Sequence, residues 1–227
     1  YGKSGVTTDP SSTASWTNYH GVWHYQSTPM NDNSPSGYNA SNNGTTAQNP
    51  AYINKGRALD GTQWMELSSF PDLSTSYSMS AWIYTTDIAR TGQRIFADDV
   101  NNTGGYAFSI SDEVTGTLRF FSRNCTPVSL DTPSGTIVAN TWYYATAVVD
   151  IAAQMKYIYV NGLLKASGAY TGTWGTDAGN ASIGGETATG ETANRLKGRL
   201  DEVRVAKSVL TADWLRTEYN NQSSPST

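Results

Sequence analysis

The strongest constraint on the fold is a series of short segments after Gly56 in which apolar and polar residues alternate. A period of two places successive side chains on opposite faces of a strand, and the intervening Gly, Asn and Asp residues favour turns. The predicted strands are Arg57–Asp60, Gln63–Ser68, Tyr77–Thr85, Arg94–Asp98, Tyr106–Ser111, Thr117–Ser122, Trp142–Ile151, Met155–Val160, Leu163–Ala169, Ala181–Gly184 and Leu196–Ala206. Many short strands without intervening helices predict an all-β sandwich of two antiparallel sheets.

Two local patterns refine this prediction. Asn161-Gly162 lies between two strand segments, and this pair favours a tight hairpin because both turn residues need a positive φ. Near the end of the chain, Thr211–Asn220 predicts one short helix, with Thr211 as its N-cap. Trp214, Leu215 and Tyr219 are expected to share the face that packs on the sandwich.

The domain organisation follows from the distribution of polar residues. Residues 1–221 are expected to form one domain, in which residues 1–55 are a polar N-terminal arm that packs on the sandwich. The arm contains an apolar island at Gly21–Tyr25, predicted as an ordered loop or an extended edge strand. Residues 222–227 (QSSPST) are expected to begin a linker, which suggests a module tethered to other domains of a longer protein.

Charge and composition exclude several classes of function. The formal net charge is −4 and the 15 Lys and Arg residues are scattered, whereas nucleic-acid binding needs a clustered basic surface. No apolar run approaches the roughly 20 residues needed to cross a bilayer, so membrane insertion is not expected. One cysteine cannot form an internal disulfide.

Several segments, in this order along the chain, resemble laminin-G-like, concanavalin A-type jelly rolls. The segments that carry the resemblance are KGRALDG at 55–61, YSMSAWIY at 77–84, Thr141–Asp150 followed by Met155–Gly162, Ser182–Gly185, KGRLDEVRVA at 197–206 and the helix at 212–219. Tyr144 departs from the pattern, in which His is frequent. The resemblance covers about residues 20–220 and implies a jelly-roll sandwich with a lectin-like function.

The resemblance also implies a structural calcium ion. Its ligands would be Asp32, in a D-x-S-x-S-G loop, and Asp201, in the LDEV segment, with help from Asn31, Asn33 and backbone carbonyls. Calcium takes six to eight oxygen ligands, and an ion here would fasten the arm to the last strand. The alternative is an Asx-turn at Asp32 and a salt bridge from Asp201 or Glu202 to a neighbouring arginine.

The sequence offers little for catalysis. Retaining glycosidases need two carboxylates about 5–5.5 Å apart, which related β-glucanases place on one strand as E-x-D-x-x-E, and this pattern is missing here. The histidine strand of jelly-roll polysaccharide lyases is also missing. His20 and His24 lie in the polar arm without the H-E-x-x-H pattern of a metalloprotease. We therefore do not expect an enzyme.

Binding of sugars is better supported, because a sugar presents an apolar face to an aromatic ring and hydroxyls to polar side chains. The predicted ligand-binding residues are Trp174, Tyr170, Tyr38, Asp177 and Asn180, with Trp16 and Tyr19 as further candidates. Trp64, Trp82 and Trp142 lie within strands and are expected to pack inside the sandwich.

The leading hypothesis is a non-catalytic carbohydrate-binding module, with structural calcium, of a secreted or cell-surface protein that degrades polysaccharides or mediates adhesion. A protein-binding adhesion module of laminin-G type is the second hypothesis, since fold does not fix the ligand. A polysaccharide lyase or glycoside hydrolase is the third.

Overall fold

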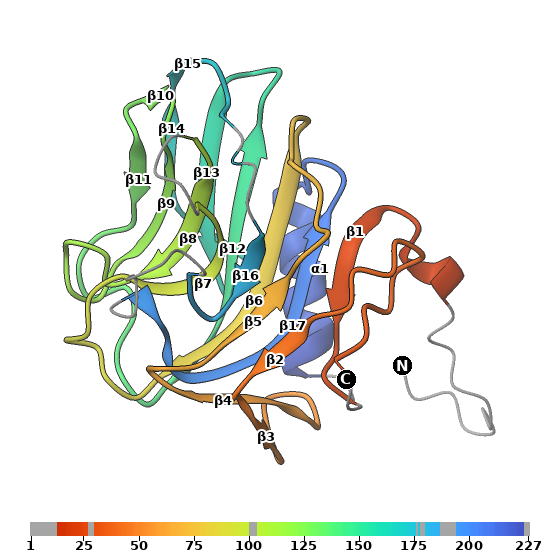
Figure 1. Ribbon diagram of the computed structural model, residues 1–227. Helices are drawn as coiled ribbons and strands as arrows, with labels where there is room; N and C mark the ends of the chain where they lie inside the picture. Colours follow the sequence, from red (N-terminus) through yellow and green to blue (C-terminus); the bar gives the residue numbers. More distant parts are fainter. Residues whose placement is uncertain are drawn as a thin grey trace.

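Two antiparallel sheets pack face to face, and an α-helix lies against the outer face of one of them (Figure 1). The computed structural model describes residues 13–26, 30–99, 104–175, 177, 180–186 and 194–224. This confirms the predicted all-β jelly-roll sandwich with one C-terminal helix in the described part of the chain. None of the described helices is long and apolar enough to span a lipid bilayer.

The larger sheet has eight strands. Their order is β14 (Leu163–Ala169), β13 (Met155–Val160), β12 (Trp142–Asp150), β6 (Tyr77–Thr85), β17 (Lys197–Ala206), β4 (Gly56–Asp60) and β3 (Thr46–Gln48), with β1 (Tyr19–Trp23) also paired to β17. The second sheet has the order β11 (Ser129–Asp131), β9 (Leu118–Ser122), β8 (Tyr106–Ile110), β7 (Gln93–Asp98), β16 (Ala181–Ile183), β5 (Trp64–Leu67) and β2 (Ser41–Asn43). A small ribbon joins β10 (Cys125–Thr126) to β15 (Thr171–Gly172).

Every strand predicted after Gly56 is present, with ends that agree to within about one residue. The apolar island of the arm forms edge strand β1, which was one of its two predicted conformations. The sequence analysis missed β2, β3, β10, β11 and β15. Each of these has only two or three residues, too few to show an alternating pattern.

Alternation along β6 divides its side chains between two environments. Tyr77, Met79, Ala81 and Ile83 belong to the core between the sheets. Trp82 points the other way: it is 1% exposed and stacks on Tyr52 with ring centroids 3.4 Å apart. Trp82 is therefore buried as expected, but on the outer face of the sheet and not inside the sandwich.

A β-bulge interrupts β17 between Asp201 and Arg204, where Glu202 has a φ of 51°. A bulge inserts one residue and redirects the side chains that follow. Val203 and Val205 consequently face the core, and Arg204 faces the helix side of the sheet. The bulge also divides the strand, because residues 197–200 pair with β4 and residues 203–206 pair with β1.

Helix α1 (Ala212–Ser223) begins as predicted, with the Thr211 hydroxyl accepting a hydrogen bond from the Trp214 amide at 3.2 Å. Leu215 is fully buried against Val148 and Tyr159. Trp214 is 55% exposed, which contradicts its predicted place beside Leu215. Adjacent helical residues point about 100° apart, and here Leu215 faces the sheet while Trp214 lies largely in solvent.

The helix also extends beyond the predicted domain end at residue 221. Gln222 is buried, and its Oε1 accepts a hydrogen bond from Trp82 Nε1 at 2.7 Å. Gln222 and Ser223 therefore belong to the folded domain and not to a linker; residues 225–227 lie outside the described residues.

Buried acidic side chains, Asp98 and Asp99, lie at the end of β7. Asp98 is 2% exposed, and its Oδ1 has no hydrogen-bond partner among the described residues. Burial, with added repulsion from Asp72, Asp177 and Asp99, raises the pKa of Asp98 to about 8. Asp98 is therefore largely protonated in the folded protein at neutral pH.

Removing the buried part of Leu215 tests the attachment of the helix. We expect Leu215→Ala to lower the free energy of unfolding by about 2–5 kcal/mol, because it removes packing and leaves a cavity. Arg216→Ala changes the exposed next residue and should alter stability by less than about 0.5 kcal/mol. Urea unfolding of both variants measures the difference, and equal effects would contradict helix packing through Leu215.

Stability should also depend on pH through Asp98. The folded state keeps a proton that the unfolded chain, with a pKa of 3.8, loses as the pH rises. The folded state is therefore favoured most below about pH 4, and this contribution is lost progressively up to about pH 8. Asp98→Asn should be more stable than the wild type at pH 7.5, by an amount on the order of a few kcal/mol, and similar to it at pH 4.

Urea unfolding between pH 4 and 8 measures this dependence. Asp60→Asn is the matched control: Asp60 is an exposed acid whose pKa is lowered by hydrogen bonds from Thr62, so its ionisation is complete below this pH window. If the free energy of unfolding of Asp98→Asn depends on pH as steeply as that of the wild type, the raised pKa of Asp98 is refuted.

Candidate ligand-binding site

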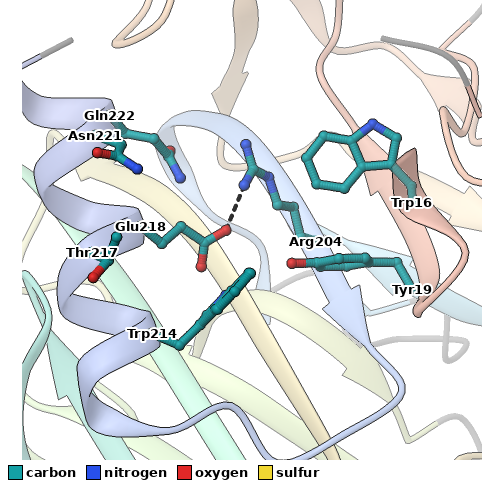
Figure 2. Close-up of a pocket in the computed structure, with 8 residues that line it drawn as sticks. All are labelled: Trp16, Tyr19, Arg204, Trp214, Thr217, Glu218, Asn221 and Gln222. Carbon is teal, nitrogen blue, oxygen red and sulfur yellow. Dashed lines mark hydrogen bonds and ion pairs between the residues drawn. The ribbon is translucent and has the colours of Figure 1, made fainter. Parts of the chain in front are cut away.

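A pocket of about 180 Å³ lies between helix α1, strand β17 and residues Trp16 and Tyr19 of the arm (Figure 2). Helix α1 contributes Trp214, Thr217, Glu218, Asn221 and Gln222. The remaining lining residues are Trp16 of the 3-10 helix η1 (Thr13–Trp16), Tyr19 of β1 and Arg204 of β17. We call this site the helix pocket; it brings together residues about 200 positions apart in the chain.

Aromatic rings form much of its wall. Trp16 and Tyr19 contact each other edge to face, with ring centroids 5.2 Å apart. Trp214 lies opposite them on the helix and is among the most exposed large apolar side chains of the described residues. Such an arrangement provides apolar surface to a ligand that enters between the helix and the arm.

Arg204 is the central charge of the pocket. One of its terminal nitrogens, Nη1, donates to Glu218 Oε1, the other, Nη2, donates to Glu202 Oε2, and its guanidinium carbon lies 4.9 Å from the centre of the Trp16 ring. Burial alone would lower the pKa of Arg204, but the two carboxylates raise it well above its usual value. Glu202 is held in turn by His24 Nδ1 at 2.7 Å.

Several buried polar atoms in this pocket have no hydrogen-bond partner among the described residues. They are Trp16 Nε1, Arg204 Nε, Glu218 Oε2 and Gln222 Nε2. Buried polar groups are normally paired, and each one left unpaired costs about 1–3 kcal/mol. These atoms are themselves covered by neighbouring side chains, so a ligand with both donors and acceptors would pair with them by displacing those side chains.

Sequence reasoning named Trp16 and Tyr19 as further candidates but missed the helical part of the pocket. Trp214, Thr217, Glu218 and Asn221 have the spacing i, i+3, i+4, i+7, which places them along one stripe of a helix. That spacing was the available signal. It was overlooked because Trp214 was assigned to the packed face with Leu215.

Trp174 and Tyr170, predicted to stack on a ligand, instead pack against the protein core. Trp174 is half-buried and lies nearly parallel to Phe120, with ring centroids 6.1 Å apart, and beside Tyr77 and Tyr106. Tyr170 is only 3% exposed, under Lys156. Both rings pack against other side chains in this way, so neither is an open platform.

The other three predicted contacts also have structural surroundings. Tyr38 is half-buried, with its ring edge against Phe70, and its carbonyl accepts a hydrogen bond from Trp23 Nε1. Asp177 is 1% exposed. Asn180 donates to Glu66. None of the five predicted residues lines the helix pocket.

Asp32 forms a hydrogen-bonded turn. Its Oδ1 accepts hydrogen bonds from the amides of Val22 and Ser34, and its Oδ2 accepts from the Ser34 hydroxyl and the Tyr38 amide, all at 2.8–2.9 Å. Two bonds on each oxygen use the lone pairs that a metal ion would need. Asp32 thus forms an Asx-turn, which was the alternative to a calcium ligand in the sequence analysis. Its oxygens do not fit the predicted calcium site.

The other predicted calcium ligands do not join Asp32 in a cluster. Asn31 is exposed, and the amide of Asn33 donates to the Val22 carbonyl at 2.7 Å. Asp201 is fully buried; its Oδ2 accepts from the Ile53 amide at 2.6 Å, and its Oδ1 has no partner among the described residues. The part of the chain that the structure describes contains no group of three or more His, Cys, Asp or Glu side chains placed to hold a metal.

A second pocket, of about 270 Å³, lies over β7 and β9 on the outer face of the seven-stranded sheet. Its aromatic residue, Phe121, is 8% exposed, and Arg94 and Arg123 lie over its ring at 5.0 and 5.5 Å. Both arginines are paired with carboxylates. The ring has no free face on which a sugar could stack, so the helix pocket is the better candidate.

The helix pocket is poorly equipped for glycoside hydrolysis. Glu218 is the only carboxylate that lines it in the part of the chain that the structure describes. Glu202, the nearest second carboxylate along Arg204, is buried and bound by both Arg204 and His24. A hydrolase needs two carboxylates with separate roles on either side of the scissile bond.

Comparison with known proteins gives a consistent picture of the fold. The model of the family described as the concanavalin A-like lectin/glucanases superfamily matches residues 59–216. A search of curated proteins finds no match. Among solved structures, domain 4 of AbnA, a GH43 extracellular arabinanase from Geobacillus stearothermophilus in complex with arabinotriose, aligns with a TM-score of 0.68 and 17% identity. That alignment covers 89% of this chain and 98% of the domain.

Two further structures are similar. The CBM40 of the Ruminococcus gnavus IT-sialidase, bound to α2,3 sialyllactose, aligns with a TM-score of 0.59 and 16% identity, over 77% of this chain and 98% of that one. The binding domain of Paraclostridial Mosquitocidal Protein 1 aligns with a TM-score of 0.68 and 18% identity over 90% of this chain. The alignment covers 52% of the toxin domain, so this chain spans about half of its length. At these identities the similarity shows the fold alone.

Proposed function

The chain belongs to the concanavalin A-like lectin/glucanases superfamily, and on this premise we propose that it is a non-catalytic carbohydrate-binding module whose ligand site is the helix pocket. The observation that carries the proposal is the combination in one pocket of exposed aromatic surface and unpartnered polar atoms. An aromatic ring takes the apolar face of a sugar, and polar groups at its edge bind the hydroxyls.

The neighbours support this choice of ligand class. Domain 4 of AbnA and the CBM40 domain are named with a bound oligosaccharide, arabinotriose in one and sialyllactose in the other. Both are parts of glycan-degrading enzymes by name, and the arabinanase is called extracellular. We propose the same context here, a module tethered to a secreted protein that degrades polysaccharides or mediates adhesion. A single pocket binds its glycan with modest affinity. Tethering to a neighbouring domain that binds the same polysaccharide raises the effective concentration and makes this affinity sufficient.

Binding of a structural calcium ion stays a prediction, with Asp201 as the one predicted side-chain ligand that still has a buried oxygen without a partner among the described residues. Its Oδ1 is a buried carboxylate oxygen without a partner among the described residues, whereas Asp32 has no oxygen to spare. The other ligands of a six- to eight-coordinate ion would be carbonyls and water. An ion bound only to the folded protein would stabilise it.

Removal of calcium tests this prediction. We expect a chelator to lower the melting temperature of the wild type, and excess calcium to restore it. Asp201→Asn should respond to neither treatment. If the chelator leaves the wild-type melting temperature unchanged, Asp201 has a structural role without a metal.

Glycan binding is tested with a panel of soluble polysaccharides that includes arabinan, in affinity electrophoresis. We expect at least one glycan to retard the wild type, and Trp214→Ala to weaken that binding about tenfold or more, because it removes the main exposed ring. Trp214 is 55% exposed, so its replacement should hardly change the melting temperature.

Leu164→Ala is the matched control, since Leu164 is a 51% exposed apolar residue on β14 outside the pocket. Retardation that persists in Trp214→Ala would place the glycan site elsewhere. If no glycan retards the protein, a protein-binding adhesion module becomes the better hypothesis, and release of sugar from any polysaccharide would indicate an enzyme.

A further inference from the structure

We propose that the helix pocket selects an uncharged sugar ring and rejects acidic sugars, with Glu218 as the acceptor that binds a ring hydroxyl. This inference rests on the proposed glycan-binding function and specifies its ligand class. Three observations support it: the hydrogen bonds that Arg204 already makes, the polar atoms that have no partner among the described residues, and the size of the pocket.

Recognition of an acidic sugar requires a cation with free donors. A carboxylate is bound best by the two parallel N–H groups of an arginine. Among the described residues, Arg204 is the only cationic side chain that lines the helix pocket, and its terminal nitrogens already donate to Glu218 and Glu202. Only Nε is without a partner among the described residues. Each terminal nitrogen of Arg204 thus already serves a carboxylate, so a uronate or a sialic acid would compete with Glu218 and Glu202 for this cation.

The local charge also disfavours an anion. The positive charge of Arg204 is already opposed by two carboxylates in direct contact, Glu202 and Glu218. A ligand carboxylate would be placed beside Glu218 without a compensating charge. Like charges in a partly buried site cost several kcal/mol, and this favours an uncharged ligand.

The free atoms match hydroxyl groups. Glu218 Oε2 can only accept a hydrogen bond, whereas Gln222 Nε2 and Arg204 Nε can only donate. Each sugar hydroxyl both donates and accepts. Glu218 and Gln222 are four residues apart on the helix and therefore neighbours on its surface, as Figure 2 shows. Adjacent hydroxyls of one ring could donate to Glu218 and accept from Gln222 or Arg204.

The size of the pocket limits the ligand to one ring at this position. Its volume of about 180 Å³ is smaller than the roughly 300–1,000 Å³ typical of pockets for drug-sized ligands. Trp214 and Trp16 provide the apolar walls for that ring. Further sugar units of a chain would remain outside the pocket.

Matched pairs of sugars test the inference. Galactose with galacturonic acid, and glucose with glucuronic acid, differ only in a hydroxyl or a carboxylate at C6; arabinose and N-acetylneuraminic acid complete the panel. Binding is measured by NMR titration, with the Trp214 indole signal as reporter. We expect at least one neutral sugar to bind and its acidic counterpart, or N-acetylneuraminic acid, to bind at least about tenfold more weakly.

The variant Glu218→Gln keeps the shape of the side chain and leaves Glu202 on Arg204. It should weaken binding of the neutral sugar about tenfold, because a charged acceptor is lost. It should also reduce the ratio between the affinities for the neutral and the acidic sugar. Asp213→Asn removes the same charge from an exposed position on the same helix. It should change neither the affinity for the neutral sugar nor the ratio between the neutral and acidic affinities.

The outcomes separate this inference from the proposed function. Binding that depends on Trp214 but favours the acidic sugars overturns the inference and leaves the glycan-binding proposal intact. Equal affinities of the wild type and Glu218→Gln for a neutral sugar also overturn it. If none of these sugars binds in a Trp214-dependent way, both proposals fail.

Discussion

A buried guanidinium joins the elements on the helix side of the sandwich. Arg204 projects from β17, pairs with Glu218 of α1 and with Glu202 beside it, and lies under the ring of Trp16 from the arm. A buried charge is tolerated only when it is paired, so these contacts hold the helix close to the strand, and Trp16 of the arm lies against the same guanidinium. The bulge in β17 directs Arg204 to this face, and the pocket exists because of that direction.

The same network gives the helix pocket its polar side chains. Pairing of Arg204 uses its terminal nitrogens but leaves Nε, the second oxygen of Glu218 and the amide of Gln222 without partners among the described residues. Gln222 also accepts the Trp82 indole hydrogen bond, which helps hold the end of the helix on the sheet. Residues that stabilise the fold thus also line the pocket.

The strands, the hairpin at Asn161-Gly162 and the helix start could all be predicted, because each depends on residues close together in the chain. The candidate site was predicted poorly for the opposite reason. Trp174 and Trp214 both occur in polar surroundings in the sequence, yet one packs on Phe120 while the other is exposed. Asp32 resembled a calcium ligand until Val22, Ser34 and Tyr38 were seen to occupy its oxygens.

The sequence by itself determined the sandwich, since hydrophobic alternation and turn residues specify strands through local sterics and burial. It also placed the helix, through an N-cap and a periodic apolar pattern. Only the tertiary structure decided which aromatic rings remain exposed and which polar atoms remain unpaired. Those properties depend on partners far away in the chain, such as His24 and Glu202, which are 178 residues apart, and no local pattern encodes such a contact.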